Sequence, residues 1–237
     1  MLDLSVFTYQ GYRVGVMCLM LNFGITLAAM YVLPQFYQNA MLIAVAAAGV
    51  LMLPGGLINA AVSVAAGTLF DRFGARGPVS IGFACSALAS AMLMIATPET
   101  PIWYMVACHI IMMIGVPLAM SPCQTHALAS IPPQLNSDGS TIMNTLQQVL
   151  GAICTAVATC LLAAGQNTYF AAGGTDSALA FTEGSHIGFA FTLIMAVFGF
   201  FLAFRINLQK EQSAQKEESV ADASLSLIHI SEPTRRR

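Results

Sequence analysis

Charged side chains are scarce in this chain. Asp, Glu, Lys and Arg make up 8% of the 237 residues, whereas hydrophobic residues make up 57%. An ordinary soluble domain carries charge on about a quarter of its residues. The chain therefore has too few charged groups to cover a water-facing surface, which argues against a soluble enzyme. The formal net charge of -2 indicates nothing about partners, and no nucleic-acid partner is expected.

Residue patterns typical of catalytic and metal sites are also missing. The six cysteines lie in or beside apolar segments without a CxxC pair, so small buried side chains are a better interpretation than metal ligands. No apolar segment contains a zinc-ligand pair, a pair of catalytic acids or a nucleophile elbow. We therefore expect no metal and no cofactor. An enzyme embedded in a membrane is the least favoured class.

The chain does contain long apolar runs. A helix needs about 20 apolar residues to cross the hydrocarbon core of a bilayer. Six runs of this kind occur, and they are apolar nearly all round rather than along one stripe. The sequence therefore predicts an all-α integral membrane protein with six transmembrane helices. The predicted spans are residues 14–33, 41–69, 78–96, 102–120, 142–164 and 187–204, with Pro34 and Pro122 expected to end the first and fourth.

The segments outside the spans complete the predicted organisation. Residues 1–13 precede a transmembrane bundle formed by residues 14–206. Residues 207–224 are polar and charged, so a disordered tail is expected there. Residues 225–237 resemble the translation of a sequencing adapter and are set aside, with a natural basic tail as the alternative. If the adapter interrupts the gene, Met1 is equally consistent with an internal methionine of a longer protein.

The cationic residues show a strong bias along the predicted topology. Six spans of alternating direction place every Lys and Arg before residue 225 on one side of the membrane. Cationic loops stay in the cytoplasm, so both termini are expected to be cytoplasmic in this multi-pass protein. The residues concerned are Arg13, Arg72, Arg76, Arg205, Lys210 and Lys216.

A ten-residue motif, GTLFDRFGAR, follows the second predicted span. A glycine at its start allows two helices to approach closely, and its aspartate can accept hydrogen bonds from the amino end of a neighbouring helix. The second glycine can adopt the positive φ of a tight reversal, and the arginines can bind acidic groups or lipid headgroups. An ordinary basic cytoplasmic turn is the alternative. The fixed positions are Gly67, Leu69, Asp71, Arg72, Gly74 and Arg76.

This motif resembles the G-x-L-x-D-R-x-G-x-R signature of the major facilitator superfamily, which follows the second helix of each six-helix half. The resemblance implies a half built of inverted three-helix repeats, in which the motif acts as a conformational latch. The fourth span lacks an arginine, the fifth lacks a G-x-x-x-G-P motif, and a charged tail follows the sixth. These features favour the C-terminal half over the N-terminal half.

Residues 31–38, 53–56, 138–140 and 144–148 are similar to stretches of the fourteen-helix EmrB/QacA-type multidrug:proton antiporters, including the lincomycin-resistance branch. The similarity implies a fragment of a secondary active transporter that exports amphiphilic drugs by proton antiport and alternating access. Its implied setting is the bacterial plasma membrane, with the lipid bilayer, the missing N-terminal half, an amphiphilic small molecule and protons as partners. A carrier of a sugar or metabolite, or a non-transporting assembly or regulatory subunit, remains as the alternative.

Several polar and sulfur-containing residues are candidates for a substrate cavity. The family resemblance places the first and fourth helices along this cavity, and unpaired polar groups are costly in hydrocarbon. For the polar residues the alternative role is a structural bond between helices, and for the methionines it is packing. The candidates are Asn22, Thr26, Tyr31, Asn59, His109, Met112, Met113, Asn144 and Gln148.

Two further features bear on the mechanism. Pro54 removes a backbone donor inside the second span, so a kink with Gly55 and Gly56 is expected there. No Asp or Glu lies inside a predicted span, although proton coupling needs a titratable group within the membrane. The coupling acids are therefore expected in the missing half. The acidic residues expected in loops or at helix ends are Asp71, Glu99, Asp138, Asp176 and Glu183.

Overall fold

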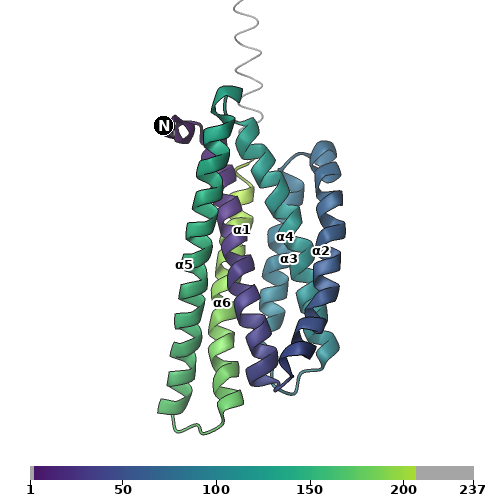
Figure 1. Cartoon of the computed structure of the whole chain (residues 1–237), viewed down its shortest axis with the longest axis vertical. Helices are drawn as coiled ribbons and strands as arrows, with labels where there is room; N and C mark the ends of the chain where they lie inside the picture. Colours follow the sequence, from purple (N-terminus) through teal and green to yellow (C-terminus); the bar gives the residue numbers. More distant parts are fainter. Residues whose placement is uncertain (1–2, 207–237) are drawn as a thin grey trace, which may run out of the picture.

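Six long α-helices form the structure, a computed structural model that describes residues 3–206 (Figure 1). Three short helical segments, η1 (Leu4–Thr8), η2 (Phe36–Ala40) and η3 (Pro133–Leu135), accompany them. The predicted all-α class is confirmed. The tail and adapter predictions for residues 207–237 lie outside the described residues. The long helices are α1 (Gln10–Gln35), α2 (Val45–Phe73), α3 (Arg76–Leu93), α4 (Ile102–Ala129), α5 (Asn136–Ala171) and α6 (Ser177–Ala203).

Five of these helices are long and apolar enough to cross a membrane, by length and composition: α1 extended by η2, α2, α4, α5 with η3, and α6. The remaining helix, α3, has 18 residues, begins at Arg76 and contains several serines and glycines, which lower its hydropathy. It nevertheless packs along α4 and α6 inside the bundle. The chain is thus a multi-pass membrane protein whose bundle agrees with half of a two-half carrier fold.

Two predicted helix ends are wrong, because prolines are tolerated inside these helices. α1 continues through Pro34, and α4 continues through Pro117 and Pro122 to Ala129. A proline leaves the carbonyl four residues earlier without its helical donor, and neighbouring helices can supply a replacement in a membrane protein. Here Asn59 Nδ2 of α2 donates to the Met113 carbonyl, which Pro117 cannot bond, at 3.2 Å.

The connection between the last two helices is much shorter than predicted. The predicted spans leave residues 165–186 between the fifth and sixth helices, yet only residues 172–176 separate α5 from α6. The side chain of Asp176 accepts hydrogen bonds from the backbone of Ala178 (2.8 Å) and Leu179 (3.3 Å) and so caps α6. Glu183 therefore lies within α6, exposed, and not in a loop or at a helix end. The sixth helix begins ten residues before its predicted start at residue 187.

The first three helices, α1–α3, and the last three, α4–α6, pack against each other rather than as two separate groups. α2 packs mainly on α4, and α5 packs on α1 and α6, while α3 contacts α4 and α6. In Figure 1, α5 and α2 accordingly occupy the two outer sides of the bundle. Inverted repeats related by a two-fold axis produce this reciprocal packing. Each group of three thus depends on the other for its contacts.

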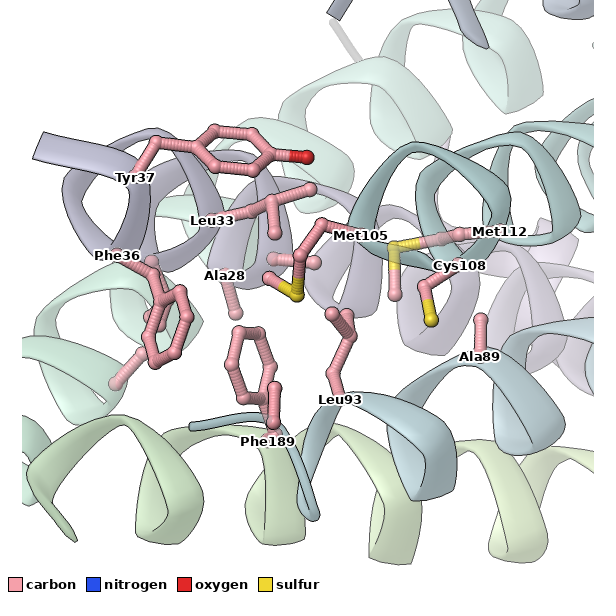
Figure 2. Close-up of a cluster of buried hydrophobic side chains, with 14 of the residues drawn as sticks. Ala28, Leu33, Phe36, Tyr37, Ala89, Leu93, Met105, Cys108, Met112 and Phe189 are labelled. Atoms are coloured by element: carbon pink, nitrogen blue, oxygen red, sulfur yellow. The ribbon is translucent and has the colours of Figure 1, made fainter. Parts of the chain in front are cut away.

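Aromatic and sulfur-containing side chains fill the core between the helices. Figure 2 shows Phe36 beside Phe189, with Leu93 and Met105 packed in the same cluster. The rings of Phe36 and Phe189 meet edge to face, with centroids 6.4 Å apart. This cluster joins η2, α3, α4 and α6 near one end of the bundle.

Small residues bring helix backbones into direct contact elsewhere. A Cβ at Gly82 of α3 would lie 2.7 Å from the Gly115 carbonyl oxygen of α4. On another side of α4, a Cβ at Gly15 of α1 would lie 2.9 Å from the Cβ of Ala127. Membrane helices associate by this kind of close packing, because burial of apolar surface drives little association in lipid. α4 is therefore held tightly on two sides by glycine contacts.

Candidate functional site

The motif of residues 67–76 forms the end of α2, a tight turn and the start of α3. Gly74 has φ 71° and ψ -173°, so the expected positive φ is present. Its N–H bonds to the Phe70 carbonyl at 2.8 Å and closes the last turn of α2. This backbone region is open essentially to glycine alone. The sequence thus encodes the reversal locally.

Replacing Gly74 by alanine is expected to destabilise the turn by about 1–3 kcal/mol, because a Cβ strains this backbone conformation. The measurement is the thermal unfolding midpoint in detergent. Gly77→Ala is the matched control, since a Cβ at Gly77 would meet only Phe73 Cβ at an ordinary 3.8 Å. Equal midpoints for the two variants would contradict the expectation.

The charged residues of the motif have few partners within the described chain. The Arg76 guanidinium stacks over the Phe204 ring at 4.8 Å from its centroid, which ties the turn to the end of α6. Asp71 is exposed and makes no hydrogen bond or ion pair within residues 3–206. The expected bond of its carboxylate to the amino end of a neighbouring helix is therefore not made here. A Cβ at Gly67 would meet no atom within 4 Å, so no other helix of residues 3–206 makes the expected close approach here.

Several chain segments gather at the same end of the bundle as the motif. Figure 1 places the N-terminus, the α2–α3 turn, the α4–α5 connection and the end of α6 together. Tyr12 donates to the Gly139 carbonyl at 2.6 Å, and the Asp3 N–H donates to Asp138 Oδ2 at 3.3 Å. The Ser5 backbone N–H bonds to the Asp3 carboxylate and lowers the pKa of Asp3. The four arginines of the described chain belong to this end: Arg13, Arg72, Arg76 and Arg205.

The candidate cavity residues fall into two groups, and the first lies inside the bundle. His109, Met112 and Met113 of α4 and Asn22 of α1 are buried. Asn22 Nδ2 donates to the Val116 carbonyl of α4 at 3.0 Å, a bond between helices. In the arrangement described, these side chains are covered by other helices.

Two other candidates near this group are partly covered. Thr26 of α1 and Asn59 of α2 are half-buried. The hydroxyl of Thr26 donates to the Asn22 carbonyl of its own helix at 2.8 Å. Asn59 is bonded to Met113, as described above. Asn59 therefore makes the bond between helices that was the alternative to a substrate contact, whereas the bond of Thr26 stays within α1.

The second group lies on an accessible face. Asn144 and Gln148 of α5 are exposed, and Tyr31 of α1 is half-buried with its hydroxyl beside the Thr159 side chain of α5. Residues three, four and seven apart share one face of a helix, and on α5 this spacing joins Asn144 and Gln148 to three threonines that the sequence prediction missed. We call the set the α5 polar face: Thr141, Asn144, Gln148, Thr155 and Thr159.

A different side of α5 is exposed but apolar. Val149, Ile153 and Val157 lie about a quarter to half a turn away from the polar face and are also exposed. Hydrocarbon accepts such side chains, whereas polar side chains turn toward protein or water. α5 therefore separates a lipid-facing surface from a polar one.

α2 is the least covered of the apolar helices. Only 11% of its most apolar 18-residue stretch is buried, against 56% of the corresponding stretches of α1 and α4. Small residues recur along one exposed side of it, and at three of the four glycines of α2 a Cβ would meet no atom within 4 Å. This pattern was not recognised in the sequence, where glycine and alanine simply extend an apolar run. We call it the α2 small-residue face: Gly49, Gly56, Ala60, Ser63 and Gly67.

The predicted kink residues lie at the middle of α2. The helix is continuous over Val45–Phe73 with Pro54 inside it, and the kink stays a prediction. Gly55 is buried against the His109 ring, which a Cβ at Gly55 would overlap, whereas Gly56 faces open space. The two adjacent glycines thus face opposite environments.

Comparison with known proteins places this bundle in a family. Residues 4–155 match the family model described as Major Facilitator Superfamily. The lincomycin resistance protein LmrB of Listeria monocytogenes is 37% identical over 214 residues, which are 89% of this chain and 45% of that protein. The lincomycin resistance protein LmrB of Bacillus subtilis is 34% identical over 86% of this chain and 44% of that protein. The chain thus spans less than half the length of these curated relatives.

Proposed function

The chain belongs to the major facilitator superfamily, and we propose that it is the C-terminal half of a carrier that exports amphiphilic drugs across the bacterial plasma membrane. The observation that carries the proposal is the similarity to two lincomycin resistance proteins over nearly the whole described bundle. In this proposal the carrier works by alternating access and proton antiport. Proteins of this superfamily are carriers, so the chain is not an enzyme.

The missing N-terminal half is proposed to pack against the exposed faces of α2 and α5. Support comes from the α2 small-residue face, because glycine-rich surfaces let membrane helices approach closely. Within residues 3–206, the Asp71 carboxylate has no hydrogen-bond or ion-pair partner. A Cβ at Gly67 would meet no atom within 4 Å. A second bundle at this position would supply both the close helix contact and a partner for the carboxylate. The motif could then act as a latch that breaks and reforms as the halves rock.

The substrate is proposed to contact the α5 polar face together with Tyr31. Thr141, Asn144 and Gln148 are exposed, whereas Tyr31, Thr155 and Thr159 are half-buried. A cavity for amphiphilic molecules needs a few polar groups of this kind among apolar ones. Asn22, His109, Met112 and Met113 are buried and are better supported as packing residues. Of the nine cavity candidates named from the sequence, this proposal keeps three: Tyr31, Asn144 and Gln148.

Proton coupling is proposed to rely on acids of the missing half. Within residues 3–206 no Asp or Glu side chain is buried, and a carboxylate that carries a proton across the membrane needs a protected site. The arginines of the described chain gather at one end of the bundle (Figure 1), which supports cytoplasmic termini by the positive-inside rule.

A drug-accumulation assay tests this function. Cells that express the completed gene are expected to accumulate less of a fluorescent amphiphilic drug than cells with an empty vector. An uncoupler of the proton gradient should remove the difference, and the 237-residue chain alone should show none. If the drug level is unchanged but the cells take up or release a sugar or metabolite, the chain belongs to a carrier of that compound instead. No transport of any of these would favour an assembly subunit.

A further inference from the structure

His109 occupies an unusual position among the buried polar residues. It is 1% exposed, and neither of its ring nitrogens has a hydrogen-bond partner within the described chain. Of the eight buried polar side chains in residues 3–206, it alone has a group that ordinarily titrates near neutral pH. An unsatisfied buried polar group costs about 1–3 kcal/mol, so its retention in an apolar helix calls for an explanation.

The ring lies in the seam between α4 and α2. Cys108, the preceding residue, points toward Ala89 of α3 (Figure 2), and His109 lies about a third of a turn further around the helix. There it meets Gly55 of α2, where a Cβ would overlap the ring at Nδ1 and Cε1. The seam closes on the imidazole because residue 55 has no side chain.

α2 is held in the bundle mainly by one neighbour, α4. It packs mainly on α4 and has few contacts with α1 or α3, and most of its length is exposed. One turn beyond Gly55 and His109, Asn59 Nδ2 donates to the Met113 carbonyl oxygen at 3.2 Å and to Met113 Sδ at 3.9 Å, the only described hydrogen bonds across this seam. A change at the ring therefore acts directly on the contact that holds α2 in the bundle.

We propose that His109 is a proton-binding site whose protonation opens the seam between α2 and α4. A proton on the ring creates a cation with two N–H donors, and a buried cation without partners is far more costly than a neutral ring. The charged form is stable only where water reaches both nitrogens, which requires α2 to move away from the ring. Proton binding and seam opening are therefore linked.

No charged side chain within the described seam offsets this effect. The charged residues of α1, α2 and α3 are Arg13, Asp71, Arg72 and Arg76, at the end of the bundle that holds the motif. The titratable groups of the core cluster that contains Met112 and Met113 are the Cys108 thiol, the Tyr37 hydroxyl and the hydroxyls of the partly buried Tyr31 and Tyr104. These groups are ordinarily neutral at pH 7. The site goes beyond the proposed export function, since it requires neither a drug nor the missing half.

Spin labels can measure the seam in the 237-residue chain reconstituted in lipid nanodiscs, with the native cysteines replaced. One pair joins Leu57→Cys of α2 to Thr125→Cys of α4, both at exposed positions. A pH of about 8 and one of about 5 bracket the ordinary titration of histidine. The distance between the labels is expected to lengthen at the lower pH, while a Met30→Cys and Thr125→Cys pair, between α1 and α4, keeps its distance.

Variants at the seam separate proton binding from other causes. His109→Gln cannot titrate and should keep the shorter distance at both pH values. Gly55→Ala, whose methyl overlaps the ring, should show the longer distance at both, whereas its neighbour Gly56→Ala should respond like the native chain. Nuclear magnetic resonance of labelled histidine rings gives a second readout that needs no variant to fold. A His109 ring that stays neutral throughout, or a pH response that persists in His109→Gln, would overturn the proposal.

Discussion

Leucine at position 82 is expected to break the contact between α3 and α4 and to remove most of the folded protein. A Cβ at Gly82 would lie 2.7 Å from both the Gly115 carbonyl oxygen and the Ala119 nitrogen. These are backbone atoms of α4, so no side-chain rotation can relieve the overlap. Overpacking of this kind costs about 1–3 kcal/mol and more where the backbone must shift. The measurement is the folded fraction in detergent by size-exclusion chromatography, together with the thermal midpoint.

Gly56→Leu is the matched control for this experiment. It makes the same chemical change in a neighbouring helix, but a Cβ at Gly56 would meet no atom within 4 Å. Its folded fraction and thermal midpoint should match those of the native chain. If Gly82→Leu were as stable as Gly56→Leu, the α3–α4 contact described here would be incorrect.

In the completed carrier, by contrast, Gly56→Leu and Gly67→Leu are expected to abolish drug export. Both glycines belong to the α2 small-residue face, where the missing half is proposed to pack. A leucine there holds two helices apart by the width of its side chain, and close packing is the main source of helix affinity in lipid. Drug accumulation should rise to the level of cells with an empty vector, while the amount of carrier in the membrane is unchanged.

Ala61→Leu serves as the control on the same helix. Ala61 is exposed, but it lies about a third of a turn away from the small-residue face and beside side chains suited to lipid. Export should therefore be close to native in this variant. Normal export by Gly56→Leu and Gly67→Leu would indicate that the small-residue face contacts lipid, and the docking proposal would fail.

The number and type of the helices could be predicted because apolar runs of sufficient length have few alternatives in a membrane protein. Their ends could not. Pro122 ordinarily argues for a helix end, and sequence alone does not show that α4 continues past it in a packed bundle. The polar composition around Asp176 indicated a loop, although an aspartate before an apolar run is also an N-cap signal.

Prediction of the site was limited in a similar way. Gly74 was found because a positive φ is a local property that one residue type supplies. Asn22 and Asn144 are the same residue in comparably apolar helices, yet the first is buried in a helix contact and the second is exposed. Which side of a helix meets its neighbours depends on the whole bundle. Periodicity could have grouped Asn144 with the threonines of α5, but it could not have shown that this group is accessible.

The reciprocal packing of α2 on α4 and of α5 on α1 also affects how the protein is made. A ribosome delivers α1, α2 and α3 to the membrane before α4 has been synthesised, so α2 initially lacks its main contact surface. During this interval the emerging polypeptide depends on the insertion machinery or on chaperones to shield its glycine-rich surfaces. A product truncated after α3 should therefore be a preferred target of membrane proteases, and synthesis of α4 should end that vulnerability.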